Sequence, residues 1–384
     1  MIENSRPRLI IFYDYFYPAY KAGGPVQSLT NLVLSLQDEY EISIVTSAYD
    51  LNDDQVLDKI ITDDWSEVML PLSPVIMKIW YAASGKLGID TIKKIIKQVA
   101  PSVIYLNGMF SFRFVLLPLI AIKKVKLIIC PRGMLQKGAL AGKPVKKKIY
   151  LAFLKISGLL NNVTWHATNE YEEADIKREF GMHAKVFVAG NIPKRPLGKI
   201  NMLQKKPGEL RLIYLSLISK KKNLLQLINI IRNMKENILL DIYGPVKDES
   251  YWKQCMGAIN DCADKITYRG NVLPDMVQST FGKYHASILL TKGENFGHAL
   301  YESFSSGRPV ITSYFTPWNQ LADKNAGWNV DISDETGIAT LISAVCDMDQ
   351  SLYDVFCSGA YSQANEYYQN GFDIGSYKKL FASL

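Results

Sequence analysis

The sequence predicts an α/β protein that is built from two Rossmann-like parallel-sheet domains. Its 384 residues are enough for two buried cores, and two domains is the expected count at this length. Apolar runs typical of buried strands alternate with helical periodicity in two successive series. Between the series, residues 191–209 carry three prolines, two glycines and no periodicity, which indicates a linker. The predicted domains are residues 1–192 and 193–365, and a C-terminal helix at about 366–384 is expected to pack back on the first domain.

The first series begins with a buried-strand pattern at residues 8–13. An aromatic turn and Gly23-Gly24-Pro25 follow, and then a helical pattern with apolar residues three and four apart over 26–36. Further strands are predicted at 42–46, 103–106, 127–130, 164–167 and 186–188. Helices are predicted at 90–98, 112–123, 143–160 and 170–180.

The second series repeats this architecture after the linker. Strands are predicted at 211–215, 239–243, 266–269, 286–290, 309–312 and 328–330. Helices are predicted at 224–234, 249–262, 273–281, 299–306, 317–323 and 335–346, and residues 353–384 read as helical and rich in aromatic residues. Ligands of such sheets bind at the carboxyl ends of the strands, so we expect a site in a cleft between the two domains.

The composition excludes several classes of protein. Hydrophobic residues make up 48% of the chain and charged residues 21%, which is typical of a globular protein. The five cysteines form no Cys-x-x-Cys pair and the four histidines do not cluster, so neither a disulfide framework nor a zinc site is expected. No signal-peptide pattern opens the chain, and its longest apolar run, residues 114–122, is too short to cross a bilayer. A cytoplasmic protein is therefore expected.

The net charge of +7 is unevenly distributed, because a basic belt lies in the first half of the chain. Its lysines stand beside apolar residues at 151, 153, 154 and 156. This pattern favours an anionic membrane surface or a phosphate-bearing substrate as partner, and it is equally compatible with a solvated helix face. Nucleic acid is disfavoured, because no binding motif accompanies the charge. The belt consists of Lys123, Lys124, Lys126, Lys137, Lys143, Lys146, Lys147, Lys148 and Lys155.

The most informative segment runs from Gly293 to Glu302 between two apolar runs. The order is strand, glycine-containing turn, helix and strand, as in a βαβ unit. Such a turn places backbone N–H groups at a helix start, where a phosphate can bind. Glu294 on the turn and Glu302 about two helical turns further could both face one ligand; alternatively, Glu302 is a solvated helix residue.

Together with other segments, this glutamate-flanked turn resembles the retaining GT-B glycosyltransferases often numbered family 4, in their capsule and exopolysaccharide branch. The resemblance covers nearly the whole chain, and the conjunction of motifs is specific although each motif alone is weak. The matching segments are Gly23-Gly24-Pro25, Cys130-Pro131-Arg132-Gly133-Met134-Leu135, His166-Ala167-Thr168-Asn169-Glu170, Ala189-Gly190-Asn191-Ile192-Pro193 and residues 214–223.

The resemblance implies a GT-B fold, with two domains facing each other across a cleft, and transfer of a sugar with retention at the anomeric carbon. The donor would be a UDP- or GDP-sugar and the acceptor a glycan or a polyprenyl-linked hydroxyl, at the inner face of the cytoplasmic membrane. Neither a cofactor nor a metal is expected, since no Asp-x-Asp triplet of the metal-dependent glycosyltransferase type appears; Asp53-Asp54 and Asp63-Asp64 are assigned to surface loops.

Each implied site residue also has a physical role. Positive groups and oriented amides should surround a departing diphosphate, and the Lys222 ammonium can neutralise it, unless it is merely a solvated member of a lysine run. Glu302 has the two acceptor oxygens needed for a ribose diol, and Glu294 would bind sugar hydroxyls. The implied catalytic set is Glu294, Lys222 and Arg132. The implied donor contacts are Gly23, Gly24, Asn295, Phe296, Gly297, His298, Glu302 and Val272, and Asn107 is expected near the acceptor or the sugar.

Three positions depart from the family pattern. Leu217 stands where the family usually has an arginine that grips the diphosphate, and leucine cannot replace that planar cation. Three explanations remain open: Lys220 or Lys221 substitutes, Arg132 reaches across the cleft, or the donor binds poorly. Asn107 and Arg132 occupy places where relatives often have histidine, which bears on donor or acceptor preference.

Two other functions compete with glycosyl transfer. A sugar-nucleotide epimerase of the same fold would interconvert donor sugars without an acceptor, and a non-catalytic scaffold in a polysaccharide assembly complex would fit the loss of the arginine at Leu217. An oxidoreductase is disfavoured, because no Gly-x-Gly-x-x-Gly motif follows the first strand.

Overall fold

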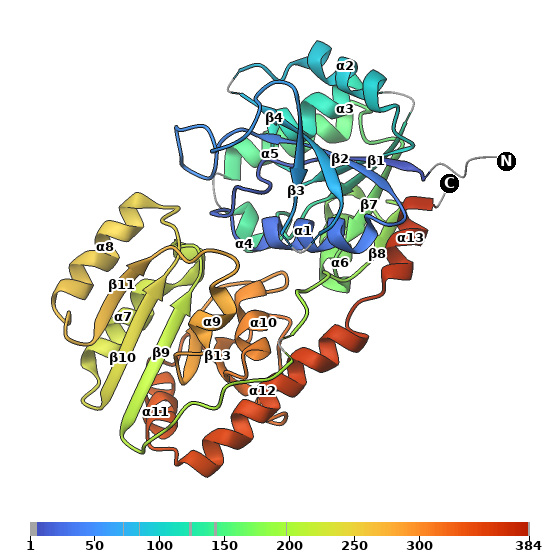
Figure 1. Cartoon of the computed structure of the whole chain (residues 1–384). Coiled ribbons are helices and arrows are strands. Elements are labelled where there is room, and N and C mark those ends of the chain that lie inside the picture. Colours follow the sequence, from blue (N-terminus) through green and yellow to red (C-terminus); the bar gives the residue numbers. More distant parts are fainter. Residues whose placement is uncertain are drawn as a thin grey trace. The chain divides into compact units, whose positions relative to one another are not determined.

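A computed structural model describes residues 6–71, 73–83, 85–122, 125–141, 144–196 and 198–382 (Figure 1). The chain divides into two compact units. Unit 1 consists of Met1–Ile192 and Phe372–Leu384, and unit 2 of Pro193–Gly371. Of the predicted basic belt, Lys123, Lys124 and Lys143 lie outside the described residues.

Unit 1 is organised around an eight-stranded sheet in the order β3-β4-β2-β1-β5-β6-β7-β8. Neighbouring strands pair in parallel, apart from β3 with β4, which is antiparallel. The strands are β1 (Arg8–Phe12), β2 (Glu41–Ser47), β3 (Trp65–Met69), β4 (Ile76–Ala82), β5 (Val103–Asn107), β6 (Lys126–Cys130), β7 (Val163–Ala167) and β8 (Val186–Val188).

Helices cover both faces of this sheet, as the alternation along β1 shows. Leu9 and Ile11 belong to a core shared with α1 and α13, whereas Ile10 and Phe12 belong to a second core with α2, α3 and α5. Successive strand residues point to opposite faces, so a continuous apolar strand requires cover on both. The helices are α1 (Gly24–Leu36), α2 (Ile89–Val99), the π-helical η1 (Phe112–Leu116), α3 (Leu117–Ala121), α4 (Lys137–Leu140), α5 (Pro144–Ile156), α6 (Glu170–Phe180) and α13 (Ile374–Ala382).

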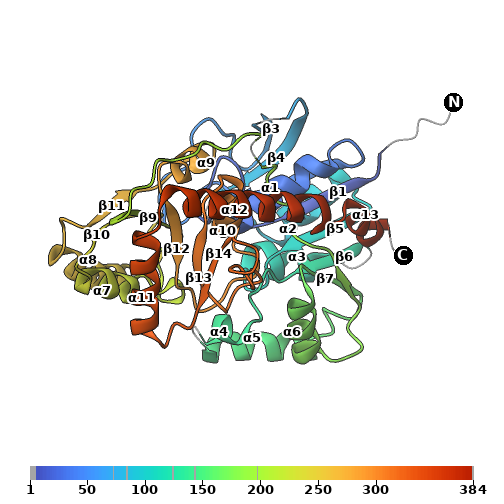
Figure 2. The same ribbon diagram turned by 90° about the horizontal axis from the view of Figure 1, so that it is seen from below.

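Unit 2 contains a six-stranded, fully parallel sheet in the order β11-β10-β9-β12-β13-β14. On one side α7 packs against α8 and α11, and on the other α10 packs against α9 and α12 (Figures 1 and 2). The strands are β9 (Glu209–Leu215), β10 (Asn237–Tyr243), β11 (Ile266–Gly270), β12 (Ala286–Leu289), β13 (Val310–Ser313) and β14 (Gly327–Val330). The helices are the 3₁₀ turn η2 (Lys220–Lys222), α7 (Leu224–Asn233), α8 (Glu249–Asn260), α9 (Val277–Phe281), α10 (His298–Ser305), α11 (Glu335–Cys346) and α12 (Gln350–Asn370).

The structure differs from the sequence prediction at a few elements. The helix predicted at 317–323 is wrong, because residues 318–320 are irregular and residues 321–323 belong to a turn. There the Thr316 hydroxyl accepts from the Trp318 N–H, and the Trp318 indole packs against Phe296, so side-chain contacts outweigh local helix propensity. The antiparallel strand β3, its neighbour β4 and the short helix α4 were not predicted.

Among the described residues, no helix combines the length and the apolar character that crossing a bilayer requires.

Two glycines of unit 2 should respond oppositely to the same substitution. Gly327 pairs with Val310 in the sheet at a φ of +145°, and a Cβ there would lie 2.0 Å from the Val310 carbonyl oxygen. Gly257 lies in α8 with open space around its Cα. We expect Gly327→Ala to destabilise the protein by more than about 2 kcal/mol. Gly257→Ala should stabilise it by about 0.5–1 kcal/mol. Urea unfolding measures both; an unchanged stability of the Gly327 variant would contradict the strand register.

Candidate functional site

An ion pair between Lys222 and Glu294 lies at the carboxyl edge of the unit 2 sheet. Lys222 ends the 3₁₀ turn after β9, and Glu294 lies on the loop after β12. The Lys222 Nζ donates to Glu294 Oε1. The two side chains are 18% and 10% exposed, so the pair is mostly shielded from water yet reachable from solvent. The adjacent parallel strands β9 and β12 bring together two predicted catalytic residues that are 72 positions apart.

Backbone hydrogen bonds hold both loops in place. The Lys292 N–H donates to the Lys221 carbonyl at 2.8 Å, which ties the β12 loop to the β9 loop. The Glu294 N–H donates to the Phe315 carbonyl at 2.8 Å, which ties the same loop to the segment after β13. The charged pair is therefore positioned by main-chain contacts on both sides, as a preorganised site requires.

Helix α10 begins immediately after this loop. Its N-cap, Gly297, has a φ of +80°, and a Cβ there would lie 3.0 Å from Leu300 Cδ1, so the turn favours glycine on both counts. Phe296 is buried, its carbonyl accepts from the Trp318 indole at 2.5 Å, and its ring packs against His298. Phe296 and Gly297 could therefore contribute to an anion site only through their main chain, as the sequence suggested for a helix N-terminus.

Glu302 is a buried carboxylate on α10. Only 8% of the residue is exposed, which is inconsistent with the alternative of a solvated helix residue. Burial raises its pKa to about 7, and Lys194 partly offsets that rise. No hydrogen bond or ion pair to its carboxylate comes from the described part of the chain. A buried, underpartnered carboxylate is a candidate for binding a ligand that carries hydroxyl groups.

Arg132 lies in unit 1, after β6, and its guanidinium is hydrogen-bonded within that unit. Its Nε donates to Asn107 Oδ1 at 2.6 Å, and its Nη1 donates to Ser28 at 3.0 Å and Asn191 at 2.7 Å. Its Nη2 donates to the Tyr105 hydroxyl at 3.1 Å. These contacts make Arg132 a connector between β5, β6, α1 and the segment after β8. A contact of Arg132 with a sugar stays a prediction.

His166 extends this network in its neutral form. Burial and nearby Arg132 lower the pKa of His166 to about 3. Its Nδ1 lies 2.8 Å from the Tyr105 hydroxyl and its Nε2 lies 2.9 Å from the Ala189 carbonyl. The Nε2 therefore carries the proton and donates to the carbonyl, and the Nδ1 accepts from the tyrosine.

The other candidate residues of unit 1 are Gly23 and Gly24 at the start of α1 and Asn107 at the end of β5. Gly23, with a φ of +71°, caps α1, and Gly24 is the first helical residue. The Asp50 carboxylate orders the loop before them by accepting from the N–H groups of Tyr20 and Lys21. Asn107 is fully buried, and its Nδ2 has no hydrogen-bond partner.

Val272 and Leu217 belong to unit 2 and are both partly buried. Val272 follows β11 and packs against the small apolar cluster around Phe281. Leu217 follows β9 and is followed by Ile218, which forms a parallel bridge with Val246. Leu217 therefore contributes no positive charge at the position where the family that the sequence resembles usually has an arginine.

The structure adds three polar residues that sequence reasoning missed. Lys247 follows β10 and lies close enough to Lys222 to be repelled by it. Lys194 lies near Glu302. Asp14 follows β1, accepts from the Ser111 hydroxyl at 2.7 Å, and has its pKa raised by burial. A signal was available for Asp14 and Lys247, since each follows a predicted strand end where parallel sheets bind ligands.

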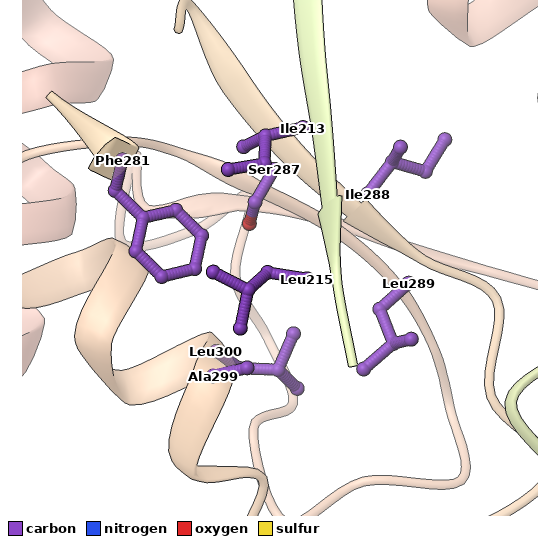
Figure 3. Close-up of a pocket in the computed structure, with 8 residues that line it drawn as sticks. All are labelled: Ile213, Leu215, Phe281, Ser287, Ile288, Leu289, Ala299 and Leu300. Atoms are coloured by element: carbon purple, nitrogen blue, oxygen red, sulfur yellow. The ribbon is translucent and has the colours of Figure 1, made fainter. Parts of the chain in front are cut away.

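An apolar pocket lies beneath this edge of unit 2 and offers little chemistry (Figure 3). Its only polar side chain is Ser287, whose hydroxyl lacks a hydrogen-bond partner. The lining residues are Ile213, Leu215, Phe281, Ser287, Ile288, Leu289, Ala299 and Leu300. The pocket is lined by residues of β9, β12, α9 and α10.

Residues 199–360 match the protein family described as Glycosyl transferases group 1. The match covers most of unit 2, including Lys222, Glu294 and Glu302. No curated protein sequence matches the chain significantly.

Solved structures with the same architecture span almost the whole chain. Sucrose-phosphate synthase from Thermosynechococcus elongatus has a TM-score of 0.73 at 16% identity, and the alignment covers 99% of this chain and 100% of that one. HepE from Anabaena, in complex with UDP and glucose, has a TM-score of 0.69 at 14% identity, covering 98% of both chains. S. aureus TarM, in a complex that contains UDP, has a TM-score of 0.69 at 12% identity, covering 98% and 100%.

These similarities confirm the predicted fold class, two parallel-sheet α/β domains of the GT-B type. At such low identity the structural likeness establishes the fold alone. Together with the family match in unit 2, it supports a GT-B glycosyltransferase.

The buried Glu302 predicts a specific pH dependence of stability. The folded protein holds this proton up to a pH of about 7, whereas an unfolded glutamate loses it near its ordinary value of 4.5. Because the folded state binds more protons between these values, the stabilisation is complete below pH 4.5 and is lost as the pH rises through 7. Glu302→Gln removes this loss, so we expect it to be more stable than wild type by about 3 kcal/mol at pH 8.

The difference between Glu302→Gln and wild type should shrink toward zero near pH 4.5. Urea unfolding at several pH values measures it. A difference that is constant with pH would contradict the assignment of a raised pKa to Glu302.

Proposed function

We propose that the protein transfers a sugar from a UDP- or GDP-sugar to a hydroxyl of a glycan or lipid-linked acceptor, in surface polysaccharide synthesis at the inner face of the cytoplasmic membrane. The observation that carries this proposal is the Lys222–Glu294 pair beside the start of α10, with buried Glu302 on that helix. A cation, a helix N-terminus and two carboxylates at one sheet edge match the diphosphate, the sugar hydroxyls and the ribose diol of a nucleotide sugar.

Donor binding would exchange partners within the ion pair. Lys222 leaves the Glu294 carboxylate and donates to the diphosphate, which frees Glu294 to accept from hydroxyls of the transferred sugar. Glu302 ionises as the ribose diol donates to its oxygens, because these hydrogen bonds stabilise its charged form. Unit 2 would in this way supply the donor site, and unit 1 the acceptor site.

The proposed reaction retains the configuration of the anomeric carbon. The bond from that carbon to the phosphate oxygen breaks, and the nucleoside diphosphate leaves with the electron pair. The acceptor oxygen forms its bond on the same face, and its proton passes to the departing phosphate. Lys222 and the amides at the α10 N-terminus stabilise the growing negative charge, so the reaction is proposed to need no metal.

The ligands bound in two structural neighbours support a uridine nucleotide as the first donor to test. The structure of Anabaena HepE contains UDP-glucose, and the structure of a TarM mutant contains fondaparinux, α-GlcNAc-glycerol and UDP. WaaG, with the same fold, is a glycosyltransferase of lipopolysaccharide biosynthesis, which supports a cell-surface glycan as the product.

Removing either member of the ion pair should strongly reduce turnover. We expect Lys222→Met and Glu294→Gln each to lower kcat by about 10²–10³-fold, because each removes a group aimed at the reacting diphosphate or sugar. Exposed Lys283→Met is the matched control and should retain activity. The assay uses UDP- and GDP-sugars with polyprenyl-linked acceptors in the presence of EDTA, and NMR gives the product's anomeric configuration.

Two outcomes would overturn the proposed reaction. Conversion of the donor sugar into its epimer without an acceptor would indicate an epimerase, and the absence of nucleotide binding would favour a scaffold. A third outcome would overturn the site assignment: full activity of the charge-swapped variant Lys222→Glu/Glu294→Lys would show that the pair is only structural, since that variant keeps an ion pair but reverses both charges.

The outer face of α5 supports the membrane part of the proposal. Its residues Val145, Ile149 and Ile156 are 68%, 65% and 84% exposed, and they follow one another at helical spacing together with Phe153. Leu151 and Leu154 on the opposite side enter the unit 1 core. Exposed Lys146 and Lys148 flank the apolar stripe. An apolar stripe between lysines is the pattern of a helix that lies in an anionic membrane surface.

Charging this stripe should release the protein from membranes. We expect Ile149→Asp to weaken binding to phosphatidylglycerol vesicles by at least about tenfold, because it removes one buried aliphatic side chain and adds a repelled charge. Ile61→Asp is the control, since Ile61 is 58% exposed elsewhere in unit 1. Vesicle flotation measures binding; equal loss in both variants, or equal binding to neutral phosphatidylcholine vesicles, would contradict the assignment.

A further inference from the structure

The diphosphate site proposed for unit 2 lacks a positively charged side chain at Leu217. This residue follows β9, five positions before Lys222, and contributes no cation. A nucleotide diphosphate carries more negative charge than Lys222 alone offsets, particularly since Lys222 is already shared with Glu294. A second cation near this place would complete the site.

The loop after β10 runs directly alongside the Leu217 segment. The Ile218 N–H donates to the Pro245 carbonyl at 2.9 Å, and the Lys247 N–H donates to the Ile218 carbonyl at 3.1 Å. Residue 244 is a glycine with a φ of +133°, where a Cβ would lie 2.0 Å from the Ser216 carbonyl oxygen. Lys247 therefore lies beside Ile218, the residue that follows Leu217, on the loop after the neighbouring strand β10.

The Lys247 ammonium shares its surroundings with Lys222. Burial and the Lys222 charge both lower the pKa of Lys247. No carboxylate pairs with the Lys247 side chain in the described part of the chain. Its neighbour Asp248 is engaged elsewhere, because it caps α8 through the Tyr251 N–H and attracts Lys220. Two lysines therefore belong to neighbouring loops of one sheet edge, and only Lys222 is paired with a carboxylate, Glu294.

We propose that Lys247 binds the nucleotide diphosphate and supplies the second positive charge, since Leu217 supplies none. This inference rests on the proposed function. Two like charges held together repel each other, and a bound diphosphate converts that repulsion into two charge-assisted contacts. Of the lysines near this edge, Lys247 is the one whose loop is hydrogen-bonded to the Leu217 segment through Ile218.

The first test compares UDP with UMP by calorimetry, with GDP and GMP in parallel. Lys247→Met should weaken binding of the diphosphate by about tenfold to a hundredfold, the effect of one lost charge-assisted hydrogen bond. Binding of the monophosphate should change much less. Lys247→Arg should restore diphosphate affinity, and Lys253→Met, an exposed lysine of α8, should leave it unchanged.

The second test restores the charge at the other position. We expect Leu217→Arg in the Lys247→Met background to recover most of the lost diphosphate affinity, because the two loops are paired. Thermal unfolding of every variant establishes that each is folded.

Each outcome bears on a different claim. If wild type binds UDP or GDP and Lys247→Met binds them equally well, this inference is wrong and the proposed function stands. If Lys247→Met weakens UDP and UMP alike and arginine does not rescue it, Lys247 has only a structural role. If wild type binds neither diphosphate, the proposed function fails and this inference fails with it.

Discussion

Parallel strand pairing is the constraint on which the candidate site depends. In each unit it directs every strand-to-helix loop to one edge of the sheet, so residues far apart in sequence become neighbours. Lys222 and Glu294 meet because β9 and β12 are adjacent, and Lys247 joins them because β10 is on the other side of β9. Gly244 and Gly297 make this crowding sterically possible, since side chains there would meet Ser216 or Leu300.

The two units treat buried charge differently. In unit 1 Arg132 donates to four side chains, and Glu172 accepts from the Gly133 and Thr168 N–H groups, so both charges are satisfied internally. In unit 2 Glu302 is buried with no donor from the described residues, and Lys247 lies beside another cation. A buried charge with its full set of hydrogen bonds stabilises the folded protein. A buried charge that lacks partners can gain hydrogen bonds from a ligand. This contrast favours unit 2 as the donor-binding unit.

Regular elements were predicted where local pattern and burial agree. Helices α6 and α11 have the bounds predicted from periodicity, and the central strands of both sheets differ from prediction by a few residues at their ends. The failures have tertiary causes. Strand β3 forms the edge of the unit 1 sheet, and only one of its five residues is buried, which weakens its apolar pattern. Strand β4 was not predicted although five of its seven residues are buried. Residues 317–323 are held as a loop by Trp318, which packs against aromatic residues from α10 and α12.

Local periodicity and short motifs at strand ends were sufficient to predict the α/β class, the repeated parallel-sheet architecture and the residue types of the site. The tertiary structure established which of those residues meet. It paired Lys222 with Glu294, buried Glu302, engaged Arg132 within unit 1 and placed Lys247 beside the gap left by Leu217. Burial, partners and pKa depend on contacts between segments that are distant along the chain, and no local pattern encodes those contacts.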